Sequence, residues 1–160
     1  MKTGLPPILN ATTRLLILGS LPGDISLARQ EYYASKTNDF WKILSALLYS
    51  DLTTLSYQER INLLQEKRIG LWDLFHRAER PGSADNDIVF QELNDFSLLR
   101  EKSPGIELIC FNGKKAGEGA SHLIGMGYRC LVLPSTSGAN RRDQQGRLRL
   151  WQTAIGSVSI

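Results

Sequence analysis

The fold of this 160-residue chain is decided by the stretch Arg14-Leu15-Leu16-Ile17-Leu18-Gly19-Ser20-Leu21-Pro22-Gly23. Its continuous apolar run predicts a buried β-strand over Arg14–Gly19, and the small residues that follow predict a turn. At such a turn the backbone can approach a phosphate or a sugar closely. The same join recurs near the C-terminus, where an apolar run ends in Leu131-Val132-Leu133 and passes into Pro134-Ser135-Thr136-Ser137-Gly138.

Between these two joins, strand-like and helix-like patterns alternate along the chain. The expected strands are Arg14–Gly19, Ile69–Asp73, Glu107–Phe111 and Tyr128–Leu133. The expected helices are Asp24–Gln30, Asp39–Ser50, 56–67 (opened by a capping-box pattern at Ser56), Glu92–Arg100, Lys114–Ile124 and Gln144–Ile155. This alternation predicts an α/β fold, in which helices cover both faces of a mostly parallel, four-stranded sheet. No linker or repeat divides the chain, so we expect one domain over residues 1–160.

Composition excludes several classes of protein. No apolar run approaches the roughly 18–20 residues of a membrane helix, and the N-terminus lacks the apolar stretch of a signal peptide, so we expect a cytoplasmic protein. The two cysteines, Cys110 and Cys130, are expected to be reduced core thiols. Two Cys and two His cannot form a four-cysteine iron–sulfur site, and we expect no metal and no other cofactor.

The charge of the chain is concentrated near its C-terminus. The whole chain carries a formal net charge of +3, yet residues 129–149 hold five arginines and one aspartate. A basic patch of this kind on a near-neutral body is what contact with phosphates requires, although a solvated helix start would also account for it.

The segments that follow the predicted strands are expected to converge. In a parallel sheet, ligands bind beyond the carboxyl ends of the strands. Those segments are Ser20–Gly23, Asp73–Ser83, Asn112–Gly113 and Pro134–Arg142. The sequence therefore predicts a single pocket at that edge of the sheet.

Two of these segments, together with Tyr32-Tyr33 and Asn38-Asp39-Phe40-Trp41, resemble the signature motifs of the uracil-DNA glycosylase superfamily. The resemblance runs from Leu15 to about Trp151 and is nearest to the branch of hypoxanthine (deoxyinosine) DNA glycosylases. It implies a three-layer α/β/α sandwich with a central four-stranded, mostly parallel sheet. It also implies a monomeric, metal-independent enzyme that binds DNA.

The resemblance implies that Asn38 is the essential catalytic residue, with an amide that orients and polarises a water molecule. The alternative is that Asn38 caps the following helix, unless Thr37 does so instead. The branch pattern has His-Pro before this asparagine, whereas this chain has Ser35-Lys36. Other branches place an Asp or Asn where this chain has Leu21, whose side chain cannot activate water.

The resemblance also implies a set of base-binding residues. Phe40 is the expected stacking platform, with a core position as the alternative. Tyr33 is expected to close the pocket, unless it packs in the core, and Asn112 to pair with the edge of the base, unless it only forms a turn. Backbone amides of Ser20 and Leu21 are expected to bind a base carbonyl.

The last motif corresponds to the loop that enters the DNA duplex in this superfamily. Its hydroxyls and amides suit phosphate binding on either side of a flipped nucleotide, and its small residues suit the vacated base stack. A polar surface loop is the alternative. The expected DNA-binding residues, with one lysine at the start of an earlier helix, are Ser135, Ser137, Gly138, Ala139, Asn140, Arg141, Arg142 and Lys114.

These features predict a DNA glycosylase that hydrolyses the N-glycosidic bond of a deaminated base, uracil or hypoxanthine, and leaves an abasic site. Asp73 and Asp85 also match superfamily patterns, and an Asx turn is the interpretation we favour for Asp85. A second hypothesis is a catalytically inactive nucleic-acid-binding module on the same fold. A third, a phosphate-binding enzyme of small molecules, lacks a G-x-G-x-x-G fingerprint.

Overall fold

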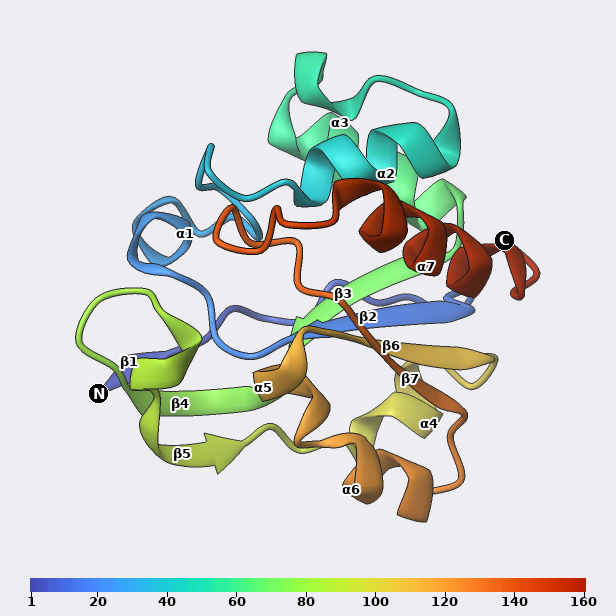
Figure 1. The fold of residues 1–160 in the computed structure, drawn as a ribbon. Helices are drawn as coiled ribbons and strands as arrows, with labels where there is room; N and C mark the ends of the chain where they lie inside the picture. The colour runs from blue at the N-terminus through green and yellow to red at the C-terminus, as the bar shows by residue number, and fades with distance from the viewer.

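The computed structural model describes residues 1–160, and a four-stranded parallel sheet lies at its centre (Figure 1). Its strands, in spatial order, are β3 (Ile69–Asp73), β2 (Leu15–Gly19), β6 (Leu108–Asn112) and β7 (Cys130–Leu133). Leu18 of β2 pairs with Trp72 on one side and with Phe111 on the other. The predicted fold class is confirmed.

Helices cover both faces of this sheet (Figure 1). On one face lie α2 (Phe40–Leu48), α3 (Tyr57–Glu66) and α7 (Gln144–Gly156), and on the other lie α4 (Leu98–Lys102), α5 (Lys114–Gly117) and α6 (Ala120–Gly125). A short helix, α1 (Asp24–Arg29), follows β2, and a 3₁₀ turn over Leu52–Thr54 follows α2. None of these helices has the length and apolar character that a membrane span requires.

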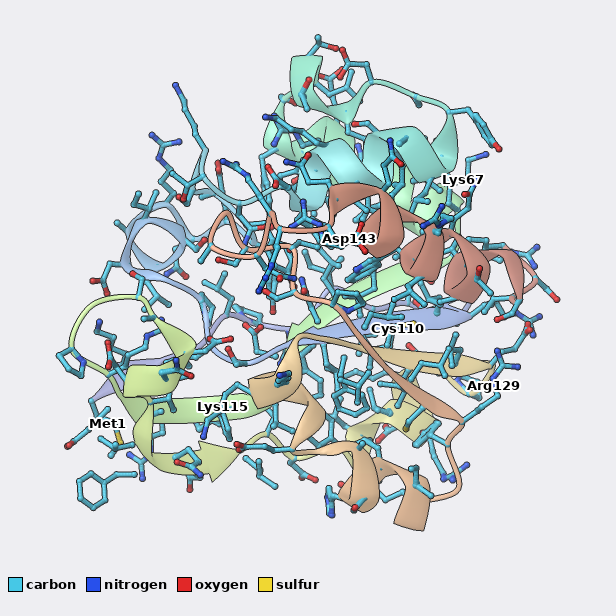
Figure 2. The ribbon with its side chains drawn as sticks, viewed as in Figure 1. Met1, Lys67, Cys110, Lys115, Arg129 and Asp143 are labelled. Atoms are coloured by element: carbon cyan, nitrogen blue, oxygen red, sulfur yellow. The ribbon has the colours of Figure 1, made fainter.

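Alternate side chains of the strands enter two separate cores. Leu15 and Ile17 of β2 pack with the layer of α2, α3 and α7, whereas Leu16 and Leu18 pack with the opposite layer. Successive strand residues point to opposite faces, so a strand buried on both faces must be apolar throughout. Figure 2 shows Cys110 of β6 inside the molecule, whereas Lys67 and Arg129 lie at its edge.

A small antiparallel sheet, which the sequence did not predict, adjoins the central one. It contains β1 (Lys2–Thr3), β4 (Phe75–Glu79) and β5 (Val89–Leu93), with the 3₁₀ turn Asp85–Asp87 between the last two strands. The prediction of a helix over Glu92–Arg100 was therefore wrong. An Asx turn, in which Asp95 accepts the backbone N–H of Ser97, delays the start of α4 until Leu98.

The helix predicted over Lys114–Ile124 is two short helices. The break falls at Glu118 and Gly119, between α5 and α6. A Cβ atom on Gly119 would overlap the side chain of Leu74. Two glycines within three residues weaken the helix, and the close packing against Leu74 explains why the second is tolerated there.

Candidate active site

A cavity of about 560 Å³ opens at the carboxyl ends of the parallel strands. Its walls come from the last residues of β2, β3 and β6, from the segments after β2 and β7, from residues 32–38 and from the loop 83–86. The predicted convergence of the strand ends on one pocket is therefore present. Of the predicted residues, the cavity contains Asn38, Ser20, Leu21, Tyr33, Asn112, Ser135, Ser137, Gly138, Ala139 and Asn140.

Asp73, at the end of β3, forms the deep end of this cavity. The residue is 4% exposed, and its Oδ2 atom has no hydrogen-bond partner. Burial, and next the negative charge of Asp85, raise the pKa of Asp73 to about 7. A Cβ atom on Gly19 would lie 2.5 Å from Asp73 Oδ1, so the glycine at this position makes room for the carboxyl group. Gly19 opens the first motif, residues 19–23.

The aromatic ring that faces the cavity belongs to Tyr33, and Phe40 lies behind it. The two rings are stacked, with centroids 3.9 Å apart and an interplanar angle of 16°. Phe40 is fully buried and does not line the cavity, whereas Tyr33 is half-buried and does. The prediction of Phe40 as the platform is corrected here: Phe40 supports Tyr33, because the apolar face of α2 turns into the core.

Asn112 lines the cavity, but its side-chain amide is hydrogen-bonded to neighbouring protein groups. Its Oδ1 accepts the backbone N–H of Thr136 at 2.9 Å, and its Nδ2 donates to Thr136 Oγ1 at 2.9 Å and to the Tyr33 hydroxyl at 3.3 Å. Asn112 thus fixes the start of the loop after β7. To bond the edge of a base, Nδ2 of Asn112 would have to exchange its present bond to the Tyr33 hydroxyl for one to the base.

Asn38 lies just before Asp39, the N-cap residue of α2, and faces the cavity. Its Oδ1 accepts the backbone N–H of Phe40 at 3.0 Å and the hydroxyl of Thr136 at 2.8 Å. The N–H of Phe40 can only donate, so the orientation of the amide is determined. Oδ1 is therefore used by the protein, and Nδ2, which has no protein partner, is the free group of Asn38.

Two residues that follow β4, Arg80 and Asp85, form hydrogen bonds with the first motif. The buried Ser20 donates its hydroxyl to Asp85 Oδ1 at 2.5 Å. The guanidinium of Arg80, which is fully covered, donates to the backbone carbonyls of Leu21, Pro22 and Gly82. Sequence reasoning treated Asp85 as a turn residue and did not predict the bonds between Arg80 and the first motif, because the contact between the two loops spans about 60 residues of chain.

The loop after β7, residues 134–142, is organised by α7. Arg147 donates from Nη1 to the carbonyls of Ser135, Ser137 and Asn140, and the indole of Trp151 donates to that of Pro134 at 2.8 Å. The loop also closes on itself, because Ser135 Oγ and Ser137 Oγ accept backbone N–H groups two residues further on. A Cβ atom on Gly138 would overlap the carbonyl oxygen of Thr37, so a glycine is needed at this close approach.

Two arginines of this region are paired with Asp39. Arg141 makes a bidentate contact at 2.8 Å to both carboxylate oxygens, and Arg147 adds a third bond at 2.7 Å. These bonds, that of Arg141 foremost, hold the pKa of Asp39 well below its usual range. Arg141 is therefore a clamp between the loop and α2, whereas Arg142 and Lys114 are exposed and form no ion pair. Arg147 was noticed in the sequence only as part of a basic stretch.

No three His, Cys, Asp or Glu side chains lie close enough together to hold a metal ion. The independence of the chemistry from metals and cofactors stays a prediction. The groups present in the cavity are an unpartnered carboxyl, a free amide donor, an aromatic face and a second carboxylate at the mouth. Together they can bind a flat heterocycle by its face and by its edge.

Comparisons with known proteins agree with this geometry. The family model of the uracil DNA glycosylase superfamily matches residues 6–155. Hypoxanthine DNA glycosylase of Methanosarcina barkeri (strain Fusaro) is 44% identical over 154 residues, which make up 96% of this chain and 98% of that protein. Hypoxanthine DNA glycosylase of Methanosarcina acetivorans is 47% identical over 155 residues, with 97% and 98% covered. A solution NMR structure from M. acetivorans, provisionally described as a uracil DNA glycosylase, has a TM-score of 0.88 and 46% identity and covers 96% of each chain.

Proposed function

Because this chain belongs to the uracil DNA glycosylase superfamily, we propose that it is a DNA glycosylase for deaminated bases. It hydrolyses the N-glycosidic bond of the base, hypoxanthine in the first place, and leaves an abasic site. The names of two full-length relatives support hypoxanthine as the substrate base. The observation that carries the proposal is the cavity itself, whose lining brings the carboxyl group of Asp73 and the free Nδ2 donor of Asn38 together with the ring of Tyr33.

Asp73 suits the edge that deaminated bases share. Hypoxanthine and uracil both carry a ring N–H next to a carbonyl, whereas adenine and cytosine carry a bare ring nitrogen next to an amino group. Because the pKa of Asp73 is about 7, its ionised form is available at neutral pH. This form accepts from the ring N–H, but it meets a lone pair on the parent base. A buried polar group that would be left unpaired discriminates strongly against the wrong ligand. Asp73 is therefore the residue that we assign to recognition of the deaminated base.

Tyr33 is the platform on which the flipped base stacks. One face of its ring is covered by Phe40, and its other side borders the cavity. Stacking of a base on an aromatic side chain contributes roughly 1–3 kcal/mol, which offsets part of the few kcal/mol needed to flip a nucleotide out of the duplex. The support from Phe40 keeps the ring in place before the base arrives.

Asn38 stabilises the departing base. When the C1′–N bond breaks, both of its electrons leave with the base, and negative charge spreads to the acceptor atom beside the glycosidic nitrogen. That acceptor is N3 in hypoxanthine and O2 in uracil. A fixed amide donor aimed at developing charge is an effective catalytic device, and Nδ2 of Asn38 is the free donor here.

The loop 134–142 contacts the DNA backbone and the gap left by the flipped base. Gly138, Ala139 and Asn140 form the lip of the cavity, and the exposed Arg142 and Lys114 lie free to contact phosphates. Ser135 and Ser137 contribute through the turns that they stabilise as well as through their hydroxyls. We assign this protein the behaviour of a single-domain monomer that acts in the cytoplasm without a cofactor.

The test is a panel of end-labelled duplexes, each with one hypoxanthine, uracil, mismatched thymine, adenine or cytosine at the same position. After incubation, alkali cleaves the strand at abasic sites. We expect strand cleavage with hypoxanthine, less with uracil, and none with the two parent bases. Salt-sensitive DNA binding without cleavage of any duplex would contradict the proposal and favour an inactive DNA-binding module.

A further inference from the structure

The reaction needs an acceptor for the proton of the attacking water, and the first motif does not supply one. The side chain of Leu21, at the position where other branches of the superfamily hold a polar residue, is apolar, buried and part of the hydrophobic core. Asn38 cannot replace it, because its Oδ1 already accepts two hydrogen bonds from the protein. The acceptor must therefore come from elsewhere in the cavity.

Two carboxyl groups line the cavity, at opposite depths. Asp73 lies at the buried end, whereas the side chain of Asp85 is 40% exposed at the mouth. A nucleotide that enters through the mouth places its base at the deep end and its sugar near the opening. Of the two carboxylates, Asp85 is thus the one that lies on the side of C1′.

Asp85 is also held in a defined position. Its Oδ1 accepts the hydroxyl of the buried Ser20 at 2.5 Å, and Arg80 Nη1 lies 3.8 Å from the same oxygen. Its Oδ2 accepts no hydrogen bond from the protein and remains available to a water molecule. Because Arg80 already joins the two loops through three backbone carbonyls, the loop does not depend on Asp85 alone for its place.

We propose that Asp85, oriented by Ser20, is the catalytic carboxylate that activates the water. This role rests on the proposed glycosylase function. The C1′–N bond breaks with its electron pair on the base, and the water oxygen forms the new bond to C1′. One proton of the water passes to Asp85 Oδ2 and then to solvent, while the base takes up one proton from solvent. The negative charge of Asp85 also stabilises the cation that develops on the sugar.

The experiment measures single-turnover excision of hypoxanthine from a duplex, and the affinity for the same duplex, for wild type and three variants. Asp85→Asn keeps an oxygen that can accept the bond from Ser20 but removes the charge and the proton acceptor. We expect its rate to fall about 100-fold or more, with affinity changed less than threefold. Ser20→Ala frees the carboxylate and is expected to lower the rate by about tenfold.

Asp87→Asn is the matched control, because Asp87 lies in the same 3₁₀ turn, is exposed and does not line the cavity. We expect its rate to equal that of wild type. A wild-type rate for Asp85→Asn, with active wild-type protein, overturns the role of Asp85 and leaves the glycosylase function intact. A loss of affinity and thermal stability in Asp85→Asn that accounts for the whole fall in rate also overturns it, because the residue would then only hold the loop. No excision by wild type contradicts the proposed function itself.

Discussion

Asp39 and Asp73 are two buried aspartates whose surroundings shift their pKa values in opposite directions. Two arginines surround the carboxylate of Asp39 and keep it ionised, whereas burial without a partner favours the protonated form of Asp73. The first carboxylate holds the architecture together. The carboxyl group of Asp73 is left without a protein partner, and its burial lowers the stability of the fold. A residue with a purely structural role would not be expected to do so.

This contrast predicts how stability depends on pH. The pKa of Asp73 is about 7 in the native state, against 3.8 as its ordinary value. Between these values the native protein binds a proton that the unfolded chain does not, so this group makes the free energy of unfolding fall as pH rises from about 4 to about 7. We expect Asp73→Asn to remove up to about 4 kcal/mol of that fall. Urea unfolding at several pH values measures it, with Asp87→Asn as the control, and parallel curves for wild type and Asp73→Asn would refute the assignment.

Tyr33 and Phe40 give a second prediction for single residues. Tyr33→Leu removes the ring that faces the cavity, so kcat/KM for hypoxanthine excision should fall about 10- to 100-fold while the thermal midpoint changes little. Phe40→Leu should chiefly lower the midpoint, because Phe40 is a fully buried core residue. The opposite pattern, with excision dependent on Phe40 and indifferent to Tyr33, would restore the platform expected from the sequence.

The comparison of these residues shows where sequence reasoning reaches its limit. A phenylalanine two residues after Asn38 and a tyrosine five residues before it are equally good stacking candidates in a sequence. Only the packing of α2 decides between them, because it turns the ring of Phe40 into the core and leaves that of Tyr33 at the cavity. The direction of the Asn38 amide is likewise set by a hydroxyl 98 residues away, which no local pattern reveals.

Among the elements, α7 acts on the site through one buried side chain. Arg147 is 5% exposed and joins the carboxylate of Asp39 to three carbonyls of the loop 134–142. Removal of one partner from a buried ion pair costs about 3–5 kcal/mol, and the second arginine on Asp39 limits the loss here. The loop therefore takes its shape from α7 and from the start of α2, and neither helix lines the cavity.

We expect Arg147→Met to lower the free energy of unfolding by about 3 kcal/mol. The affinity for duplex DNA should fall as well, because the loop loses its three carbonyl contacts. Arg149→Met, an exposed arginine on the same helix, should change stability by less than about 0.5 kcal/mol. Chemical denaturation and fluorescence anisotropy measure both effects. Equal stability of the two variants would show that Arg147 does not organise the loop.

The elements themselves were more predictable than their contacts. The strands β2, β3 and β6 are apolar runs that are buried along their whole length, and this pattern is readable without a structure. The edge strand β7 is also apolar, although its Leu131 and Val132 are exposed. The antiparallel sheet was missed because β5 is exposed along its whole length and carries no apolar periodicity. The break between α5 and α6 depends on Leu74, which comes from a distant loop.

At the scale of the molecule, the charge that the sequence places near the C-terminus is only partly free. Of the five arginines in residues 129–149, Arg141 and Arg147 are paired with Asp39, and Arg129 donates to Ser157. Arg142 and Arg149 remain exposed and unpaired. The proposed DNA-binding surface therefore carries fewer available cations than the composition indicates, and Lys114 adds one from another segment.

This count predicts the salt dependence of DNA binding. The slope of log K against log [salt] reflects the number of phosphates neutralised, and each contact adds about 0.9 for duplex DNA. Arg142→Gln should reduce the slope by about 1, as should Lys114→Gln. Arg77→Gln should leave the slope unchanged, because Arg77 lies on β4 and is paired with Glu92. Titrations over a series of salt concentrations provide the test, and an unaltered slope for Arg142→Gln would place the DNA on another surface.

The measurement that tests the central claim most directly is single-turnover excision of hypoxanthine by wild type and by Asn38→Asp. The substitution retains an oxygen for the N–H of Phe40 and the hydroxyl of Thr136, and it replaces the free Nδ2 donor with a negatively charged acceptor. We expect wild type to release the base and Asn38→Asp, with an unchanged thermal midpoint, to be slower by about 100-fold or more. Excision by Asn38→Asp at the wild-type rate would contradict the claim that this amide donor assists the departure of the base.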